Sequence, residues 1–126
     1  MTRRKEPFGS AAAPLTPALR VGDTVYVSGQ VPVGPDGKVA GDEVRTQTKQ
    51  VLENMEAQLQ AAGATRADVV KTLVVLPHVK RDFAAMNEVY SAFFPDPKPA
   101  RTTLGGELAI DILVEIEAIA VIDAGR

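Results

Sequence analysis

Two segments that are apolar on both sides of a predicted β-strand place the strongest constraint on the fold. Residues 69–76, VVKTLVVL, contain only Lys71 and Thr72 as polar or charged residues, and residues 112–122, ILVEIEAIAVI, contain only Glu115 and Glu117. Successive side chains of a strand point to opposite faces, so both segments need cover on two sides. A sheet built from them therefore requires a layer of structure against each face.

The chain supplies two amphipathic helices for this purpose. Apolar residues recur at helical spacing over residues 44–62, and Gly63 follows at a position typical of a helix C-terminus. A second helix is predicted from Asp82, a favourable N-cap, to Phe94, where the Pro-rich PDPKP ends it. Two helices of this length suffice for one face of a small sheet.

The order of elements predicts an α+β fold of the ββαβαβ type. Short strands are expected at residues 18–21 and 24–31, a capped helical turn at TRAD (65–68), and the two apolar strands at 69–76 and 112–122. With both helices on one face of a mixed sheet, no segment is left to cover the other face. We therefore expect a second copy of the chain to cover it, which predicts a homo-oligomer.

Composition excludes several classes of function. The chain has 126 residues, so we expect one domain over 1–126, with residues 1–13 as a flexible arm. The absence of cysteine removes disulfides, thiolate nucleophiles and iron–sulfur ligation. A net charge of −2 argues against nonspecific nucleic-acid binding. No apolar run is long enough for a signal peptide or membrane span, so we expect a cytoplasmic protein that binds neither membrane nor nucleic acid.

One arginine and two carboxylates form the main candidate site. Arg101 precedes the last predicted strand, in which Glu115 and Glu117 share a face with apolar neighbours. A covered carboxylate must be paired or hydrogen-bonded, and a guanidinium binds carboxylates through two nitrogens. The residues alone leave open whether this is a structural ion pair or a ligand site. His78 is the sole histidine, which gives no plausible metal motif, and no metal is expected.

Motifs along almost the whole chain resemble one known family. VYVSGQVP, QTKQVLENMEAQLQAAGA, DVVKTLVVL, DFAAMNEVYSAFF, PARTT and LVEIEAIA occur in the order expected of the Rid family, the YjgF-type reactive intermediate deaminases. The resemblance covers about residues 14–121, and PARTT together with VEIEAIA is its most specific part. It implies a chorismate-mutase-like fold and a homotrimer whose active sites lie in clefts between subunits. It also implies hydrolysis of enamine or imine intermediates to a 2-keto acid and ammonia, without a cofactor or metal.

The resemblance assigns roles to individual residues. Arg101 matches the arginine that binds the substrate carboxylate, and Glu115 matches the glutamate that orients or activates the attacking water. Ser28 and Asn87 match polar positions that line the cleft. Gly29, beside Ser28, would let the backbone approach the ligand closely. Glu117 is expected to be structural.

Three departures from the family pattern concern the shape of the cleft. Pro14-Leu15-Thr16 replaces a segment that carries an aromatic residue in many members, so Leu15 removes an aromatic wall. Thr103 stands where many members have cysteine. The link from Arg101 to Glu115 contains Gly105-Gly106 and is about one residue shorter than usual. All three alter the predicted substrate pocket.

Other functions remain open at this stage. A larger aminomuconate-type acid would fit a cleft that Leu15 has widened. A trimer that binds small carboxylic acids without turnover would use the same Arg101 cleft. A ribonuclease is disfavoured by the single His78, the acidic balance and the low aromatic content of 5%.

Overall fold

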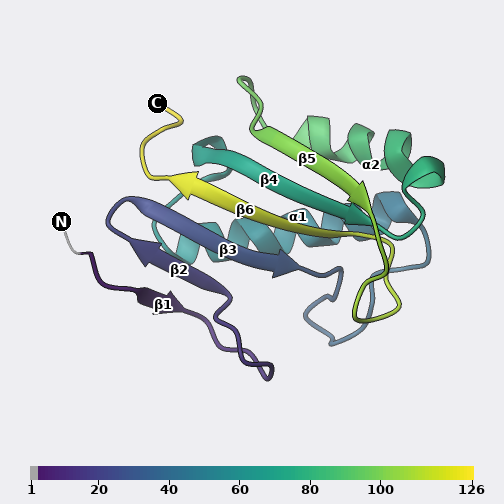
Figure 1. Cartoon of the computed structure of the whole chain (residues 1–126), viewed down its shortest axis with the longest axis horizontal. Coiled ribbons are helices and arrows are strands. Elements are labelled where there is room, and N and C mark those ends of the chain that lie inside the picture. Colours follow the sequence, from purple (N-terminus) through teal and green to yellow (C-terminus); the bar gives the residue numbers. More distant parts are fainter. Residues whose placement is uncertain (1–2) are drawn as a thin grey trace.

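The structure, a computed structural model, describes residues 3–126 as a six-stranded sheet with two α-helices (Figure 1). The strand order across the sheet is β1-β2-β3-β6-β4-β5, and every pairing is antiparallel except that of β4 with β5. In chain order the elements are β1 Glu6–Phe8, β2 Ala18–Val21, β3 Thr24–Gln30, α1 Val44–Ala61, the short 3₁₀-helix η1 Arg66–Asp68, β4 Val69–Leu76, α2 Val79–Phe93, β5 Ala100–Gly105 and β6 Glu115–Val121.

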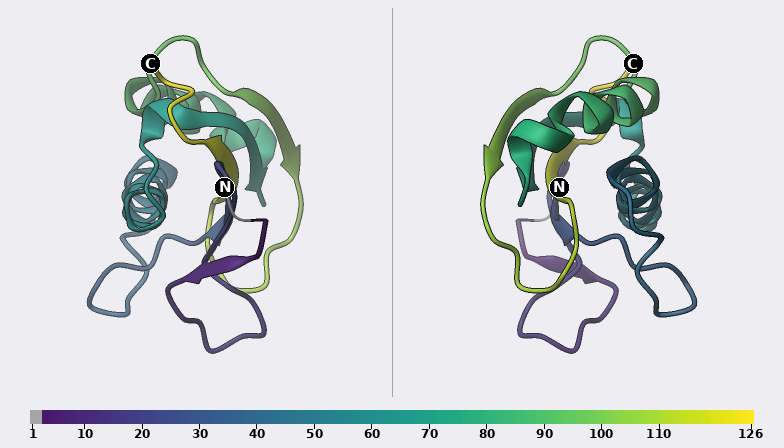
Figure 2. Two further views of the ribbon diagram at one scale, coloured as in Figure 1. Left: turned by 90° about the vertical axis from the view of Figure 1, so that its left-hand side faces the viewer. Right: turned by 90° about the vertical axis from the view of Figure 1, so that its right-hand side faces the viewer.

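Both helices lie on the same side of the curved sheet, as the two side views show (Figure 2). Helix α1 packs against β3 and β6, and α2 packs against β4 and β5. The core fills the space between helices and sheet, and its fully buried side chains include Leu52, Met55, Leu59, Val74, Leu76, Met86, Phe94 and Ile116. The predicted α+β class with a mixed sheet and two helices on one face is confirmed.

The helix boundaries show which sequence signals were interpreted correctly. Helix α1 begins after Glu43, whose side chain accepts a hydrogen bond from Arg45 N, and it is followed by Gly63 at φ 93°. The prediction that Asp82 caps α2 is wrong, because the helix begins at Val79 and Asp82 lies in its first turn. A carboxylate is favourable anywhere in the first turn of a helix, where it faces the positive end of the dipole, so Asp82 marked the turn and not the cap.

Two strands were not predicted, and one begins later than expected. Strand β1 pairs with β2 inside the segment expected to be a flexible arm, so residues 6–8 are an edge strand; residues 1–2 lie outside the described part. Strand β5 pairs in parallel with β4 although its sequence, ARTTLG, shows little apolar alternation. Strand β6 begins at Glu115 and not at residue 112, because residues 112–114, of which Ile112 and Val114 are buried, form an irregular connection.

The face of the sheet opposite the helices carries apolar residues in cross-strand rows. Residues that are partners across β6, β4 and β5 include Glu115, Val75 and Leu104 in one row and Glu117, Leu73 and Thr102 in the next. Ile119 and Tyr26 are partners in the row that follows, and Tyr26 is exposed. Within residues 3–126 no helix covers this face. Its apolar side chains are those that the expected second copy of the chain would cover, which stays a prediction.

A buried carboxylate joins η1 to the C-terminal end of the chain. Asp68 Oδ2 accepts a hydrogen bond from Thr65 N at 2.9 Å, and Asp68 Oδ1 accepts one from Gly125 N at 2.9 Å. This confirms the capping box predicted at TRAD. Since Asp68 is buried and accepts both bonds, it fixes the entry into β4 and the turn that follows β6.

We expect Asp68→Ala to lower the free energy of unfolding by about 2–3 kcal/mol, because it leaves two backbone donors without their acceptor. Urea unfolding followed by circular dichroism measures this change. The matched control is Asp36→Ala, which removes an exposed carboxylate that accepts a hydrogen bond from Lys38 N. Equal unfolding midpoints for the two variants would contradict this role of Asp68.

Candidate functional site

Arg101 is held on the helix side of the sheet by two aromatic rings of α2. Its cross-strand partner on β4 is Thr72, whose side chain is buried beneath the helices. The guanidinium carbon lies 4.7 Å from the ring centroid of Tyr90 and 5.6 Å from that of Phe83. Both distances are within the range of cation–π attraction. The rings therefore orient the guanidinium at the sheet edge formed by β5.

The Tyr90 side chain is itself held by a hydrogen bond to β4. Its hydroxyl lies 2.6 Å from Thr72 Oγ1, and the residue is buried. Burial raises the pKa of the Tyr90 hydroxyl, although the Thr72 hydrogen bond and the Arg101 charge act in the opposite direction. The phenol is therefore neutral near pH 7, and its ring supports Arg101 without pairing with its charge.

A pocket of about 320 Å³ opens beside Arg101, lined by Asn87, Tyr90, Ser91, Lys98, Pro99 and Arg101. Lys98 uses its ammonium to hold the C-terminal end of α2, donating to Ser91 O at 2.7 Å and to Phe94 O. Within residues 3–126, no carboxylate forms an ion pair with Arg101. The Arg101 guanidinium is therefore the positively charged group of this pocket that is available to a ligand.

Two polar atoms near Arg101 are buried without a hydrogen-bond partner in the described chain. They are Asn87 Oδ1, on the same pocket wall, and Thr103 Oγ1, two positions further along β5 and on the same side of the sheet. Buried polar atoms without partners are rare in folded proteins. Asn87, Arg101 and Thr103 thus form one half-site on the helix side, with polar atoms still to be satisfied.

Glu115 and Gly29 form a second half-site on the open face. A Cβ built on Gly29 would lie 2.9 Å from Glu115 Cδ and 3.1 Å from Glu115 Oε2. The register between β3 and β6 shifts between Val27 and Gln30, so Gly29 sits in an irregularity that makes room for the glutamate. Burial raises the pKa of the Glu115 carboxyl, and the neighbouring charge of Glu117 raises it further. Such a carboxyl can take up and release protons nearer neutral pH.

Ser28 adjoins this second half-site and is hydrogen-bonded to the segment that contains Leu15. Ser28 Oγ donates to Thr16 O at 2.6 Å, and Ser28 N donates to Pro17 O at 2.9 Å. Ser28 thereby ties β3 to the segment between β1 and β2 that carries Leu15. The Leu15 side chain is 52% exposed and so is not part of the core.

The structure separates the predicted site residues into two groups within one chain. Arg101 is in register with Thr72 and points to the helix side, whereas Glu115 is in register with Val75 on the open face. The two residues also lie about 10 Å apart across the sheet and about 10 Å apart along it, from standard strand spacings. The described chain contains no Arg101–Glu115 ion pair, so the structural alternative left open by the sequence is not found. One chain provides two incomplete halves of the predicted site.

Sequence reasoning missed Phe83 and Tyr90 as parts of the site. Both lie in the apolar stripe of α2, where aromatic residues are expected to serve the core. Phe83 is 42% exposed, however, and this exposure distinguishes it from a core residue. Their contact with Arg101 depends on the parallel pairing of β5 with β4, which no local pattern revealed.

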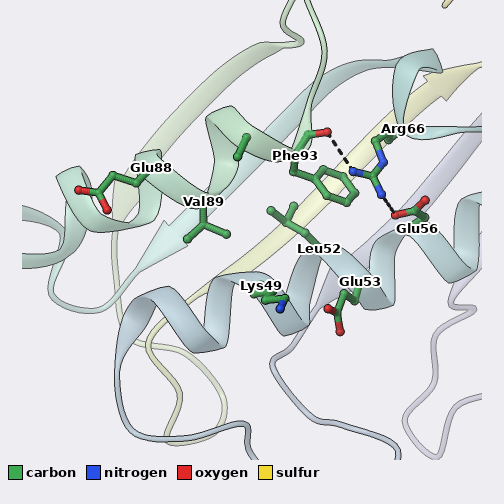
Figure 3. A pocket seen from close by; sticks show the side chains of 9 residues that line it. Lys49, Leu52, Glu53, Glu56, Arg66, Glu88, Val89 and Phe93 are labelled. Carbon is green, nitrogen blue, oxygen red and sulfur yellow. Dashed lines mark hydrogen bonds and ion pairs between the residues drawn. The ribbon is translucent and has the colours of Figure 1, made fainter.

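A larger pocket, of about 480 Å³, lies between α1 and α2, away from both half-sites (Figure 3). Leu52, Val89 and Phe93 contribute apolar surface to it. Arg66 lies over the Phe93 ring at 4.0 Å, donates to Phe93 O and pairs with Glu56. Its charge is therefore used in packing η1 against the helices, and the pocket contains none of the residues expected in the site.

The described residues lack two further features, a metal-binding cluster and a membrane-spanning helix. Among them, no three acidic or histidine side chains come together in an arrangement that could hold a metal ion. Neither of their helices combines the length and hydropathy required to cross a lipid bilayer.

Comparison with known proteins places the chain in a family. The family described as Endoribonuclease L-PSP matches residues 4–122. The chain therefore belongs to this family, also called YjgF/RutC/Rid. Its fold is shared with solved members: RidA from the Antarctic bacterium Psychrobacter sp. PAMC 21119 is 36% identical with a TM-score of 0.84, over 97% of this chain and 99% of that one.

Two sequence relatives illustrate the range of names in the family. A RutC family protein of Pyrococcus abyssi is 45% identical over 109 residues, which cover 85% of each chain. A protein of Salmonella typhimurium named 2-iminobutanoate/2-iminopropanoate deaminase is 39% identical over 116 residues, which cover 89% of this chain and 90% of the relative.

We expect Gly29→Ala to move the Glu115 carboxyl, because the new methyl group would lie within van der Waals contact of Glu115 Cδ. The displaced side chain would reach water, so its pKa would fall toward the ordinary value for glutamate. A carbon-13 NMR titration of the glutamate carboxyls measures the shift. Gly106→Ala is the matched control, since a Cβ there would meet nothing closer than 3.8 Å. An unchanged Glu115 titration in Gly29→Ala would contradict the close approach.

Proposed function

We propose that this protein is a hydrolytic deaminase of enamine and imine intermediates, which releases a 2-keto acid and ammonia. The observation that carries the proposal is the Arg101 guanidinium, which is oriented by two rings beside a pocket and has no carboxylate partner within residues 3–126. A small imino acid offers the missing carboxylate. The relative named 2-iminobutanoate/2-iminopropanoate deaminase supports this substrate class.

Arg101 acts as the carboxylate clamp. A guanidinium presents two parallel N–H donors that match the two oxygens of a carboxylate, which fixes the orientation of the bound acid. The rings of Tyr90 and Phe83 hold the guanidinium plane before the substrate arrives. The clamp therefore places the imine carbon at a defined distance from the sheet edge.

Glu115 activates water. An enamine first takes a proton from solvent on its carbon and becomes the protonated imine, whose carbon is electrophilic. Glu115 accepts a proton from water as the oxygen bonds to that carbon and the C=N electron pair moves to nitrogen. The Glu115 carboxyl then returns this proton to the nitrogen of the carbinolamine, and ammonia leaves as the C=O bond forms and the hydroxyl proton passes back to Glu115. A carboxyl whose pKa is raised by burial and by Glu117 is suited to both proton transfers. Positioning and proton transfer together need no further reactive group.

A homotrimer would join the two half-sites. Arg101 and Glu115 point to opposite faces of one sheet, so a complete site requires Arg101 of one copy beside Glu115 of another. The uncovered apolar rows around Leu73, Val75 and Ile119 supply a surface for that contact. The active sites would then lie in clefts between subunits.

The size of the substrate depends on the open-face half-site. Leu15 leaves that wall without an aromatic ring, which gives space for an extended acid of the aminomuconate type.

The family description contains the word endoribonuclease. A ribonuclease activity is not proposed, because the chain has a single histidine and a net charge of −2.

We expect Arg101→Ala to abolish turnover of 2-aminoacrylate, since a desolvated arginine–carboxylate contact is worth about 2–5 kcal/mol. The measurement is release of ammonia and pyruvate when the protein is added to a lyase that generates 2-aminoacrylate. Arg101→Lys keeps the charge without the two-oxygen contact and should recover only part of the rate. Arg45→Ala, which removes an exposed arginine paired with Glu88, is the control.

Equal rates for the wild type and Arg101→Ala would show that Arg101 does not bind the substrate carboxylate. Binding of a 2-keto acid that requires Arg101, together with no imine turnover by the wild type, would instead indicate a non-catalytic carboxylate-binding protein. Faster turnover of extended enamines than of 2-aminoacrylate would favour the larger substrate class.

We expect Ile119→Glu to dissociate the oligomer, because it replaces an apolar side chain beside Tyr26 on the open face with a charge that would lose its water in the interface. Sedimentation equilibrium should give the mass of three chains for the wild type and a smaller mass for the variant. The control is Ala57→Glu, which makes the same change in charge at an exposed position of α1. A wild-type protein that sediments as a monomer would refute both the trimer and the shared site.

A further inference from the structure

Two amides on one face of α1 hold the backbone segments that border the Glu115 half-site. Gln47 and Asn54 are seven residues apart, about two helical turns, so their side chains lie on the same side of the helix. Each makes hydrogen bonds to backbone groups that lie outside the regular strands. Neither residue belongs to the half-sites described above.

Gln47 acts on the connection that leads into β6. Its Oε1 accepts a hydrogen bond from Leu113 N at 2.8 Å, two residues before Glu115, and its Nε2 donates to Gly41 O at 3.0 Å. The residue is 3% exposed. Residues 106–114 contain no helix or strand, and Gln47 holds them to α1 through its hydrogen bond with Leu113 N. Gln47 thus ties the connection before β6 to α1, while β6 itself is fixed from Glu115 onward by its pairing with β4.

Asn54 acts in the same way on the segment that follows β3. Its Nδ2 donates to Val31 O at 2.9 Å and to Val33 O at 3.0 Å, and its Oδ1 accepts from Gln50 Nε2. These bonds hold the backbone directly after Gly29 and Gln30. Gly29 makes room for the Glu115 side chain. The backbone next to Gly29 and the backbone next to Glu115 are therefore both held by side chains of α1.

We infer that Gln47 and Asn54 are positioning residues which set where the Glu115 carboxylate stands relative to a bound substrate. The inference rests on the proposed role of Glu115. Small displacements of a catalytic group cost large factors in rate. Pairing with Val75 fixes the Glu115 backbone on its β4 side, and the two amides hold the irregular backbone that precedes Glu115 and follows Gly29. Arg101 lies on β5 and has no contact with either amide, so substrate affinity should be independent of them.

The experiment compares Gln47→Met, Gln47→Glu and Thr48→Val in the 2-aminoacrylate assay. Met removes both hydrogen bonds, whereas Glu keeps an acceptor for Leu113 N. Thr48→Val is the matched control, because the Thr48 hydroxyl is fully buried in the same turn and has no partner in the described chain. We expect kcat to fall about tenfold or more in Gln47→Met with KM changed less than about twofold. Gln47→Glu should lie between it and the wild type, and Thr48→Val should match the wild type.

A purely structural role gives a different pattern. If kcat in Gln47→Met equals that of Thr48→Val while the Leu113 amide exchanges faster with solvent, the inference is overturned. A kcat that falls only in proportion to the folded fraction also overturns it. If Gln47→Met does not fold, Asn54→Asp decides, since it is isosteric and loses the two donors to residues 31 and 33; a wild-type kcat would refute the inference.

A readout independent of turnover separates this inference from the proposed function. If the wild type hydrolyses no imine, the proposed function fails, and the Glu115 carboxyl is followed by NMR titration instead. The charged group that acts on Glu115 is Glu117, and the adjoining residues Val75 of β4 and Gly29 of β3 are uncharged. A titration midpoint that moves in Gln47→Met but not in Thr48→Val supports the positioning role, and identical midpoints overturn it.

Discussion

The pairing of β4 with two different neighbours is the constraint on which the rest of the structure depends. Strand β4 pairs in parallel with β5 and antiparallel with β6, and it thereby fixes the register of both strands that carry the main site residues. Arg101 is placed beside Thr72 on the helix side, and Glu115 beside Val75 on the open face. A shift of one residue in either pairing would turn the corresponding side chain to the other face of the sheet. The register therefore decides that the two halves of the candidate site lie on opposite faces of one chain's sheet.

The helix layer serves the site as well as the core. Helix α2 holds Arg101 from above through Tyr90 and Phe83, and α1 reaches the segments around Glu115 through Gln47 and Asn54. Each half-site is thus tied to one helix, and the same layer buries the apolar side of the sheet. Family membership agrees with this arrangement, since the chain shares its fold with the solved structure of RidA from Psychrobacter at a TM-score of 0.84.

The sequence predicted the elements whose signals are local. Helix α1, strand β4 and the capped turn at residues 65–68 were placed within one residue, because their apolar periods and turn residues lie within each element. Strand β5 was missed because ARTTLG becomes a strand through its parallel pairing with β4, which lies 29 residues earlier in the chain for the partners Thr72 and Arg101. The burial of Ile112 and Val114 without strand pairing made the predicted start of β6 too early, since apolar content indicates burial and not hydrogen bonding.

The sequence by itself determined the class of fold, the family and the identity of the candidate site residues, because these follow from apolar periodicity and from motifs read residue by residue. Only the tertiary structure decided that Arg101 and Glu115 lie on opposite faces, that Arg101 rests on two aromatic rings, and that Gly29 gives space to Glu115. The physical reason is that strand register and helix packing join residues that are distant in the chain. No local pattern carries that information, whereas a single residue of register changes which face a side chain occupies.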